Sequence, residues 1–248
     1  AEIFKAYDIR GIVDKSLTAD VVRRIGHALG SLAAEQGQNA IAVGRDGRLS
    51  GPELAGALMD GICATGVDAI DDGCVPTPVT YFAAFELGCK SCVSVTGSHN
   101  PPDYNGLKMV IGGTTLALEA IQNLKQRIEA GNLKHGRGER RSADVKSAYI
   151  DKIVGDVKLA RPLKIVMDCG NGVAGAFAPE LFKRLGCEII PLFCEVDGNF
   201  PNHHPDPSKP ENLADVIKAL KETDAEIGIA FDGDGDRLGV VTKDGEII

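Results

Sequence analysis

Three aspartates alternate with two glycines over residues 232–236, directly after the apolar run 227–231, which has the composition of a buried strand. In an extended strand, alternate side chains lie roughly 6.6 Å apart, too far to share one ion, so the segment must curl, and its glycines permit this. Three carboxylates held together repel one another unless a divalent cation lies between them. The segment therefore predicts a metal site made by Asp232, Asp234 and Asp236, and the alternative is an acidic, solvated turn.

Magnesium is the cation that this segment favours. A calcium loop of the EF-hand type needs a glutamate at its twelfth position, whereas the twelfth residue counted from Asp232 is Lys243. Carboxylate oxygens are also the ligands that Mg²⁺ takes from proteins. We therefore expect Mg²⁺ as the cofactor.

A serine and a histidine stand side by side, Ser98 and His99, in the segment 96–101 that follows the apolar run 92–95. Loops at the carboxyl ends of strands line the mouth of an α/β site. The glycine before Ser98 lets the backbone turn and present the hydroxyl, and His99 is able to donate to a phosphate oxygen or to relay a proton. The segment predicts a reactive, phosphate-handling loop, and the alternative is a rigid Asn-Pro turn with an incidental Ser-His pair.

The segment 170–175 competes with these two as a site. It matches Gly-x-Gly-x-x-Gly after the apolar run 163–167, with Glu195 further along the chain. By spacing alone this is a dinucleotide fingerprint, which keeps an NAD-binding oxidoreductase as an alternative. Pro179 argues against it, because a proline inside the following helix delays or kinks that helix.

Two further patterns are interpreted as structural. The pair His203-His204 lies in a proline-rich segment and indicates a loop rather than a metal site. Cys89 and Cys92 have Cys-x-x-Cys spacing, but no second pair completes a zinc site, so reduced thiols are preferred to a redox motif.

Helix and strand signals alternate along the chain. Capping boxes begin helices at Ser50 and at Ser208, and Thr18 caps a helix that we expect to end at Gly30. The β-rich runs between helices are residues 40–43, 92–95, 107–111, 163–167, 188–193 and 227–231. This alternation predicts an α/β fold with mainly parallel strands.

A polar segment, residues 134–144, separates two such series. We therefore predict two similar domains, residues 1–144 and 145–248, each a mixed, mainly parallel sheet flanked by helices. The chain ends inside the second strand of a predicted hairpin, residues 238–241 and 246–248, which predicts that it is the front part of a longer protein.

Charge and hydropathy exclude several classes of function. The 27 basic and 35 acidic residues give a net charge of −8, which disfavours nonspecific binding of nucleic acid. Apolar stretches stop well short of the ~20 residues that cross a bilayer, so we expect no membrane partner. No export signal begins the chain, and its seven cysteines fit reduced thiols, so we expect a cytoplasmic protein.

Four ordered segments carry a resemblance that covers nearly the whole chain. Residues 6–11 read Ala-Tyr-Asp-Ile-Arg-Gly, residues 44–48 read Gly-Arg-Asp-Gly-Arg, and the segments 96–101 and 232–237 follow them. Together they resemble the α-D-phosphohexomutases, most closely the bacterial phosphomannomutase/phosphoglucomutase branch. Under this resemblance the segment 170–175 is a family loop that opens the second domain.

The resemblance implies a phosphoserine at Ser98 that passes its phosphoryl group to a hexose monophosphate of mannose or glucose. The resulting 1,6-bisphosphate turns round and returns its other phosphoryl group to the serine. The residues it implies as catalytic are Ser98, His99, Lys108, Arg10 and Arg237; those that bind substrate are Tyr7, Arg10, Ser98, Lys108 and Arg237; and those that hold Mg²⁺ are Ser98, Asp232, Asp234 and Asp236.

The charge balance agrees with these roles. Three carboxylates and one Mg²⁺ sum to a charge of −1, and a phosphoserine adds about −2, so the site needs cations such as Arg10, Lys108 and Arg237. A serine hydroxyl is a poor nucleophile without a base, and both Lys108 and His99 are candidates for that role.

The family has four domains, of which this chain resembles the first two. We therefore expect the chain to contain the phosphoryl-transferring half of the site and not the half that selects the sugar. Two alternatives stay open besides the oxidoreductase: a phosphoglucosamine mutase of the same family, and a non-enzymatic module that binds metal or sugar phosphate.

Overall fold

The structure of the chain is a computed structural model that describes residues 2–248. It divides into two compact units, which meet in the sequence between Val145 and Lys146. Each unit contains one sheet with helices packed on it, so the predicted α/β class with mixed sheets is confirmed. No helix in the described part of the chain has both the length and the apolar character needed to span a membrane.

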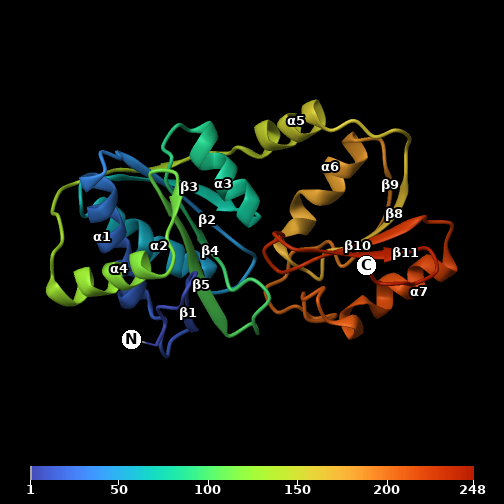
Figure 1. The fold of residues 1–248 in the computed structure, drawn as a ribbon, viewed down its shortest axis with the longest axis horizontal. Coiled ribbons are helices and arrows are strands. Elements are labelled where there is room, and N and C mark those ends of the chain that lie inside the picture. Colours follow the sequence, from blue (N-terminus) through green and yellow to red (C-terminus); the bar gives the residue numbers. More distant parts are fainter. Residues whose placement is uncertain (1) are drawn as a thin grey trace. The chain divides into compact units, whose positions relative to one another are not determined.

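The first unit is built on a seven-stranded sheet (Figure 1). Its elements in chain order are β1 (Ile9–Ile12), α1 (Ala19–Glu35), β2 (Ala40–Arg45), α2 (Gly51–Cys63), β3 (Asp68–Cys74), α3 (Thr77–Glu86), β4 (Cys92–Val95), β5 (Tyr104–Ile111), β6 (Thr114–Thr115), α4 (Glu119–Ala130) and β7 (Arg140–Ser142). The strand order is β1-β5-β4-β2-β3-β7, with β6 beside β5. Strands β4, β2, β3 and β7 pair in parallel, whereas β1, β5 and β4 pair antiparallel.

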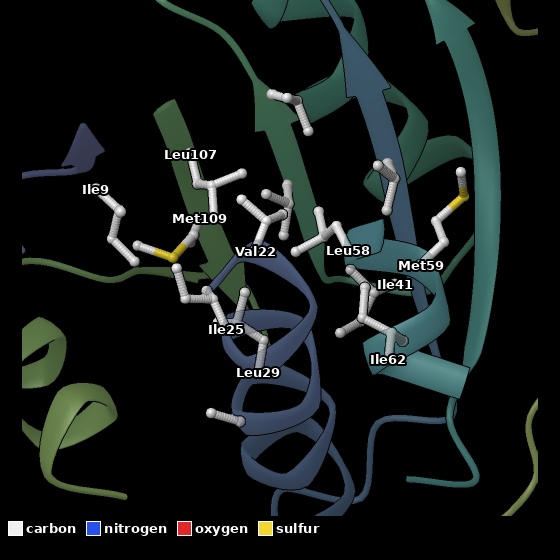
Figure 2. Close-up of a cluster of buried hydrophobic side chains, with 14 of the residues drawn as sticks. Ile9, Val22, Ile25, Leu29, Ile41, Leu58, Met59, Ile62, Leu107 and Met109 are labelled. Atoms are coloured by element: carbon white, nitrogen blue, oxygen red, sulfur yellow. The ribbon is translucent and has the colours of Figure 1, made fainter. Parts of the chain in front are cut away.

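Helices cover both faces of this sheet because successive strand residues point to opposite sides. Ile41 of β2 packs with Ile25 of α1 and Leu58 of α2 in the main apolar core, as Figure 2 shows. On the other face, α3 lies so close to β2 that a Cβ on Gly44 would meet Thr80 Oγ1 at 2.0 Å.

The second unit has a four-stranded sheet in the order β11-β10-β8-β9. Its elements are α5 (Lys146–Asp156), β8 (Lys164–Asp168), the 3₁₀ helix η1 (Val173–Ala176), α6 (Ala178–Arg184), β9 (Glu188–Leu192), the 3₁₀ helix η2 (Pro210–Leu213), α7 (Ala214–Glu222), β10 (Ile227–Phe231) and β11 (Leu238–Thr242). Strands β9, β8 and β10 are parallel, and β11 is antiparallel to β10. Met167 packs on the α6 side of the sheet and Val166 on the α7 side.

Two predicted element boundaries are wrong for reasons of packing. Helix α1 begins at its Thr18 cap, as predicted, but it runs past Gly30 to Glu35. A Cβ on Gly30 would lie 2.6 Å from Thr65 Oγ1, just after α2. This glycine therefore lets α1 pack closely against the neighbouring segment and does not end the helix. The predicted strand 246–248 reduces to a single bridge between Ile247 and Val241.

The two predicted capping boxes do not form. Ser50 Oγ accepts a hydrogen bond from the Asn105 side chain at 2.9 Å and does not cap α2. Ser208 Oγ donates to Asp206 at 2.6 Å, and the chain that follows it enters the 3₁₀ turn η2 before α7. In both places a tertiary or loop partner competes for the hydroxyl that the local pattern assigns to the helix.

Candidate active site

Ser98 lies in the loop that follows β4, residues 96–101, which we call the serine loop. Its backbone is in the left-handed region, with φ = 50°, and its side chain is buried. The Ser98 N–H donates to Thr96 Oγ1 at 2.8 Å, and Ser98 Oγ lies 3.4 Å from His99 Nδ1. A non-glycine residue is rarely found in this conformation, so the surroundings must impose it.

A buried ion pair beneath the serine loop imposes this conformation. Arg48 Nε lies 3.2 Å from Asp46 Oδ2, and both side chains are inaccessible to solvent. The Arg48 guanidinium donates to four backbone carbonyls, those of Ser98, Asn100, Pro101 and Tyr104, at 2.6–3.0 Å.

Asp46 completes the arrangement from the other side of the loop. Its Oδ2 atom accepts from the Thr96 hydroxyl at 2.8 Å and from the Gly97 N–H at 3.2 Å. A Cβ on Gly97 would lie 2.4 Å from Arg48 Cζ, so only glycine fits at this position. The loop that carries Ser98 is therefore rigidly held by charged groups of the same unit.

Strands beside the serine loop carry the other candidate residues of the first unit. Lys108 of β5 pairs in register with Ser94 of β4 and is half-buried. Arg10 of β1 pairs with Gly106, whose carbonyl in turn accepts from the Thr96 N–H at 3.0 Å. Lys108 and Arg10 thus lie on the two strands that follow β4 in the sheet.

The Arg10 side chain forms one ion pair and keeps one buried N–H donor that meets no protein acceptor among the described residues. Its guanidinium forms an ion pair with Asp8, whereas Arg10 Nε is buried with no hydrogen-bond partner among the described residues. Tyr7, just before this pair, is 72% exposed. The edge of the sheet near β1 therefore offers an aromatic ring and an uncommitted N–H donor.

The acidic loop, residues 232–237, follows β10 in the second unit. One carboxylate oxygen from each of Asp232, Asp234 and Asp236 lies within 4.8 Å of the others, so the three side chains form a cluster able to hold a metal ion. The loop curls at Gly235, where φ = 71°, and Asp232 Oδ1 accepts from the N–H groups of Asp236 and Arg237 at 3.1 Å.

Electrostatics within the acidic loop favours a cation. Asp232 and Asp234 are buried and Asp236 is exposed. Burial, together with the charges of Asp234 and Asp236, raises the pKa of Asp232 from 3.8 to about 7. A bound divalent cation reverses this effect, because it stabilises the ionised carboxylates.

The glycine loop, residues 170–176, supports the acidic loop. The Val173 N–H donates to Gly233 O at 3.2 Å, the Gly172 N–H to Cys169 O at 2.7 Å, and the Asn171 N–H to Phe193 O at 2.8 Å. A dinucleotide site needs such N–H groups for the diphosphate. Here they are occupied by protein carbonyls, which argues against the oxidoreductase alternative.

A histidine–carboxylate pair anchors the start of the glycine loop. His203 Nε2 lies 2.9 Å from Asp168 Oδ2, and His203 Nδ1 lies 3.0 Å from the His204 carbonyl. Burial lowers the pKa of His203, but the hydrogen bonds to Asp168 and the His204 carbonyl outweigh it, so the pKa is raised above 6.5. The His203-His204 segment is a loop, as predicted, in which His203 binds Asp168.

Burial and a raised thiol pKa at Cys92 argue against a redox motif at the Cys-x-x-Cys segment. Cys89 and Cys92 are both buried. Burial, followed by the neighbouring Cys89 and Asp72, raises the pKa of the Cys92 thiol to about 12. A thiol that stays protonated is a poor nucleophile, which agrees with a structural role.

Asp46, Arg48, Asp168 and His203 are the supporting residues to which the sequence assigned no role. Asp46 and Arg48 both lie in the segment 44–48, which contributes to the family resemblance. Their spacing alone, however, does not show that the two charges form a buried ion pair. Of the predicted residues, Ser98, His99, Lys108, Arg10 and Tyr7 belong to the first unit, and the three aspartates and Arg237 belong to the second.

Comparison with known proteins identifies relatives along the whole chain. The family described as phosphoglucomutase/phosphomannomutase, alpha/beta/alpha domain I, matches residues 1–135, and domain II of the same family matches residues 147–245. A phosphomannomutase/phosphoglucomutase of Pseudomonas aeruginosa is 56% identical over 248 residues, which is 100% of this chain and 54% of that protein. A phosphoglucomutase of Neisseria gonorrhoeae is 59% identical over 249 residues, again 100% of this chain and 54% of the relative.

One solved structure is similar over nearly the whole chain. A phosphoglucomutase/phosphomannomutase family protein from Burkholderia thailandensis is 61% identical, with a TM-score of 0.96 over 99% of this chain and 56% of that one. The chain thus spans about half the length of the curated relatives it matches.

Proposed function

The chain belongs to the phosphoglucomutase/phosphomannomutase family, and from this premise we propose that it is the phosphoryl-transferring part of a cytoplasmic phosphohexomutase. Ser98 carries the phosphoryl group. Phosphoserine gives it to a hexose monophosphate, and the 1,6-bisphosphate that results returns its other phosphoryl group. Mannose and glucose phosphates are the proposed substrates, because the relatives are named for these two sugars.

The observation that carries the proposal is the construction of the serine loop. A buried ion pair and four carbonyl contacts hold one serine in a strained conformation, with His99 Nδ1 3.4 Å from its hydroxyl oxygen. Phosphoryl transfer depends on in-line positioning more than on covalent machinery, so a rigidly presented hydroxyl suits it.

Proton transfer accompanies each exchange. When the P–O bond to Ser98 breaks, the serine oxygen needs a proton, and the attacking sugar hydroxyl releases one. We propose that His99 or Lys108 moves this proton, His99 from its contact with Ser98 and Lys108 from the adjacent strand β5.

Cations from the chain balance the charge of the phosphates. Arg10 has a buried Nε donor that meets no protein acceptor among the described residues, and a phosphate oxygen fits this donor. Arg237 is exposed at the end of the acidic loop, and Tyr7 is exposed beside Arg10. We assign Arg10, Arg237 and Tyr7 to substrate binding.

The acidic loop fits Mg²⁺. Oxygens on opposite sides of this ion are about 4 Å apart, and the carboxylate oxygens lie within 4.8 Å of one another. We propose that Asp232, Asp234 and Asp236, with an oxygen of Ser98, hold the ion. When bound, Mg²⁺ neutralises charge on the phosphoryl oxygens and makes the phosphorus more electrophilic.

Labelling with a hexose bisphosphate tests the role of Ser98. We expect the complete protein to take up ³²P from labelled glucose 1,6-bisphosphate, and the Ser98→Ala variant to take up none. Ser142→Ala, which changes an exposed serine of β7, is the matched control and should label normally. Labelling of Ser98→Ala would place the acceptor elsewhere, and a tryptic peptide about 80 Da heavier would identify it.

The same labelling separates His99 from Lys108. If Lys108 moves the proton, the rate of phosphoryl transfer should fall strongly in Lys108→Met and should no longer depend on pH. In His99→Gln the rate should keep the pH dependence of the wild type. The opposite pattern would assign the proton transfer to His99. If the pH profile of the transfer rate is unchanged in both variants, neither residue moves the proton.

Manganese titration tests the metal site, because bound Mn²⁺ is visible by electron paramagnetic resonance. We expect Asp234→Asn to weaken binding at least about tenfold, and Asp224→Asn, an exposed residue paired with Lys164, to leave it unchanged. Mn²⁺ should also broaden the ³¹P resonance of phosphoserine in the complete protein. A sharp resonance at saturating Mn²⁺ would remove Ser98 from the ligand set.

The chain alone should transfer phosphate poorly to a sugar. We propose that the groups that select the sugar lie outside this chain, because the relatives are about twice as long. Glucose 1-phosphate turnover by residues 1–248 at the rate of the complete protein would contradict this.

A further inference from the structure

Two thiols of the second unit lie in contact beside the glycine loop. Cys194 Sγ is 3.5 Å from Cys169 Sγ. Cys169 directly follows β8 and is buried, and Cys194 follows β9 and is half-buried. The two parallel strands hold this register, because the Cys169 N–H donates to Leu192 O at 3.1 Å. Neither sulfur takes part in the chemistry proposed above.

We propose that Cys169 and Cys194, hereafter the thiol pair, form a reversible disulfide under mild oxidation and that this closure shifts the glycine loop against the acidic loop. The sulfur atoms need to approach by about 1.5 Å, because a disulfide bond is about 2.05 Å long. Rotation of side chains already in contact, with small backbone adjustment, covers such a distance.

The oxidation balances with hydrogen peroxide as the oxidant. The Cys194 sulfur attacks one peroxide oxygen, the O–O bond breaks, and the products are Cys194 sulfenic acid and water. The Cys169 sulfur then attacks the Cys194 sulfur, and the sulfenic oxygen leaves as a second water with the proton of the Cys169 thiol. Two thiols and one peroxide thus give one disulfide and two waters.

The difference between the two thiols favours this order of events. Cys194 is the more exposed residue of the two, so peroxide should reach it first. The hydrogen bond between the thiols lowers the pKa of Cys194 and, together with burial, raises that of Cys169. Cys194 is therefore the attacking thiolate and Cys169 the resolving thiol.

Close packing transmits the closure to the acidic loop. A Cβ on Gly175 would lie 2.0 Å from Cys194 O, so the glycine loop rests directly on the Cys194 backbone. A Cβ on Gly172 would lie 3.0 Å from Gly233 O, and the Val173 N–H donates to the same oxygen. With so little space on either side, movement at Cys194 displaces the backbone next to Asp232 and Asp234.

Mass spectrometry of the chain tests the disulfide. One equivalent of peroxide should lower the intact mass by about 2 Da, and dithiothreitol should restore it. Trypsin should then yield a cross-link between the peptide 165–183, which contains Cys169, and the peptide 185–218, which contains Cys194 and Cys187. The Cys187→Ser variant removes this ambiguity and should keep the cross-link.

Two variants and one further measurement keep both parts of the proposal falsifiable. Cys194→Ser should lose the cross-link, and Cys169→Ala should stop at an unresolved sulfenic acid on Cys194 that dimedone traps. A wild-type chain that keeps its full mass, or a cross-link from Cys187 instead, overturns the disulfide. Because the mapping needs no mutation, a variant that fails to fold does not obscure the result.

Hydrogen exchange of the acidic loop tests the transmission. Peptides covering residues 232–237 should exchange differently in the oxidised and reduced wild-type chain, and identically in Cys194→Ser after the same treatment. Equal exchange in the two wild-type forms overturns the transmission. Only the consequence for metal binding rests on the proposed function, since both measurements are made without metal, substrate or turnover.

Discussion

The support of the serine loop and the acidic loop both contain buried carboxylates, with opposite electrostatic surroundings. Under the serine loop, Asp46 is buried against Arg48, and the two charges lie 3.2 Å apart. In the acidic loop, Asp232 is buried beside two further aspartates, which help to raise its pKa to about 7. The first arrangement holds its own counter-charge, whereas the second brings carboxylates together, and a bound divalent cation would stabilise it.

This difference separates a scaffold from a ligand site. A buried carboxylate with a guanidinium partner and several hydrogen bonds fixes backbone geometry without any ligand. A cluster of carboxylates at similar depth is costly until a divalent ion enters. Burial of an acidic side chain therefore does not by itself mark a metal site; the convergence of several carboxylate oxygens on one point favours one.

The largest expected effect comes from removing the scaffold's cation. Arg48→Met removes the guanidinium counter-charge of the buried Asp46 and the donor to four carbonyls, so we expect a loss of about 3–5 kcal/mol in the free energy of unfolding. Urea denaturation measures this. Arg24→Met is the control, because its pair with Asp20 is 67% exposed on both sides and should cost at most about 0.5 kcal/mol. Similar losses in both variants would contradict a special role for the buried pair.

A smaller loss should follow from crowding the same pair. Gly97→Ala places a methyl group 2.4 Å from Arg48 Cζ and should destabilise the fold by about 3 kcal/mol or less. Gly155→Ala in α5 adds the same methyl group to open space and should be neutral or stabilise by up to about 1 kcal/mol. Thermal unfolding of the two variants gives the comparison, and a neutral Gly97→Ala would mean that Arg48 is mobile.

A third buried carboxylate should behave in the opposite way to Asp46. Both oxygens of Asp72 are buried with no hydrogen-bond partner among the described residues, and burial, with Asp144 and Asp71, raises its pKa from 3.8 to about 7. A raised carboxyl pKa means that stability present below pH 4 is lost as the pH rises through the folded pKa of about 7, above which no more is lost.

Asp72→Asn should therefore stabilise the first unit at pH 8, by on the order of 2 kcal/mol, and much less at pH 5. Urea unfolding at the two pH values measures the difference. An equal effect of the substitution at both would show that the charge of Asp72 is not the cause.

The smallest effect concerns a largely buried ion pair of the second unit, Asp168 with His203, whose cation can lose its charge. The folded pKa of His203 is raised, so its contribution is complete below 6.5 and is lost as the pH rises through the folded value. We expect His203→Gln to cost about 0.5–1 kcal/mol at pH 6 and nothing at pH 8.5. Wild-type stability, followed by urea titration across this range, should fall while the variant stays level, and parallel curves would refute the assignment.

Local patterns predict the strands that lead into both loops. The runs 92–95 and 227–231 are apolar and bounded by turn residues, and they agree with β4 and β10 in their bounds. Alternation of three aspartates likewise predicts the cluster, because the glycines between them permit the curl that brings the carboxylates together.

What supports the loops lies beyond such patterns. Asp46 and Arg48 are two residues apart, yet their role depends on carbonyls that arrive fifty residues later. By its type, Gly30 predicts a helix end, and only the packing of α1 against Ile62 and Thr65 shows why a glycine is needed inside the helix. The contact between Cys169 and Cys194 follows from the register of β8 and β9, which periodicity does not specify.

The pairing of β1 with β5 also dictates when the first unit matures. Ile9 lies opposite Leu107, so β1 lacks its neighbouring strand in the sheet until β5 has been synthesised. Closing so long a stretch of chain is slow, and Arg48 likewise waits for the carbonyls of residues 98–104. The strand bearing Arg10 and the turn bearing Ser98 should thus lock together late in the folding of the first unit.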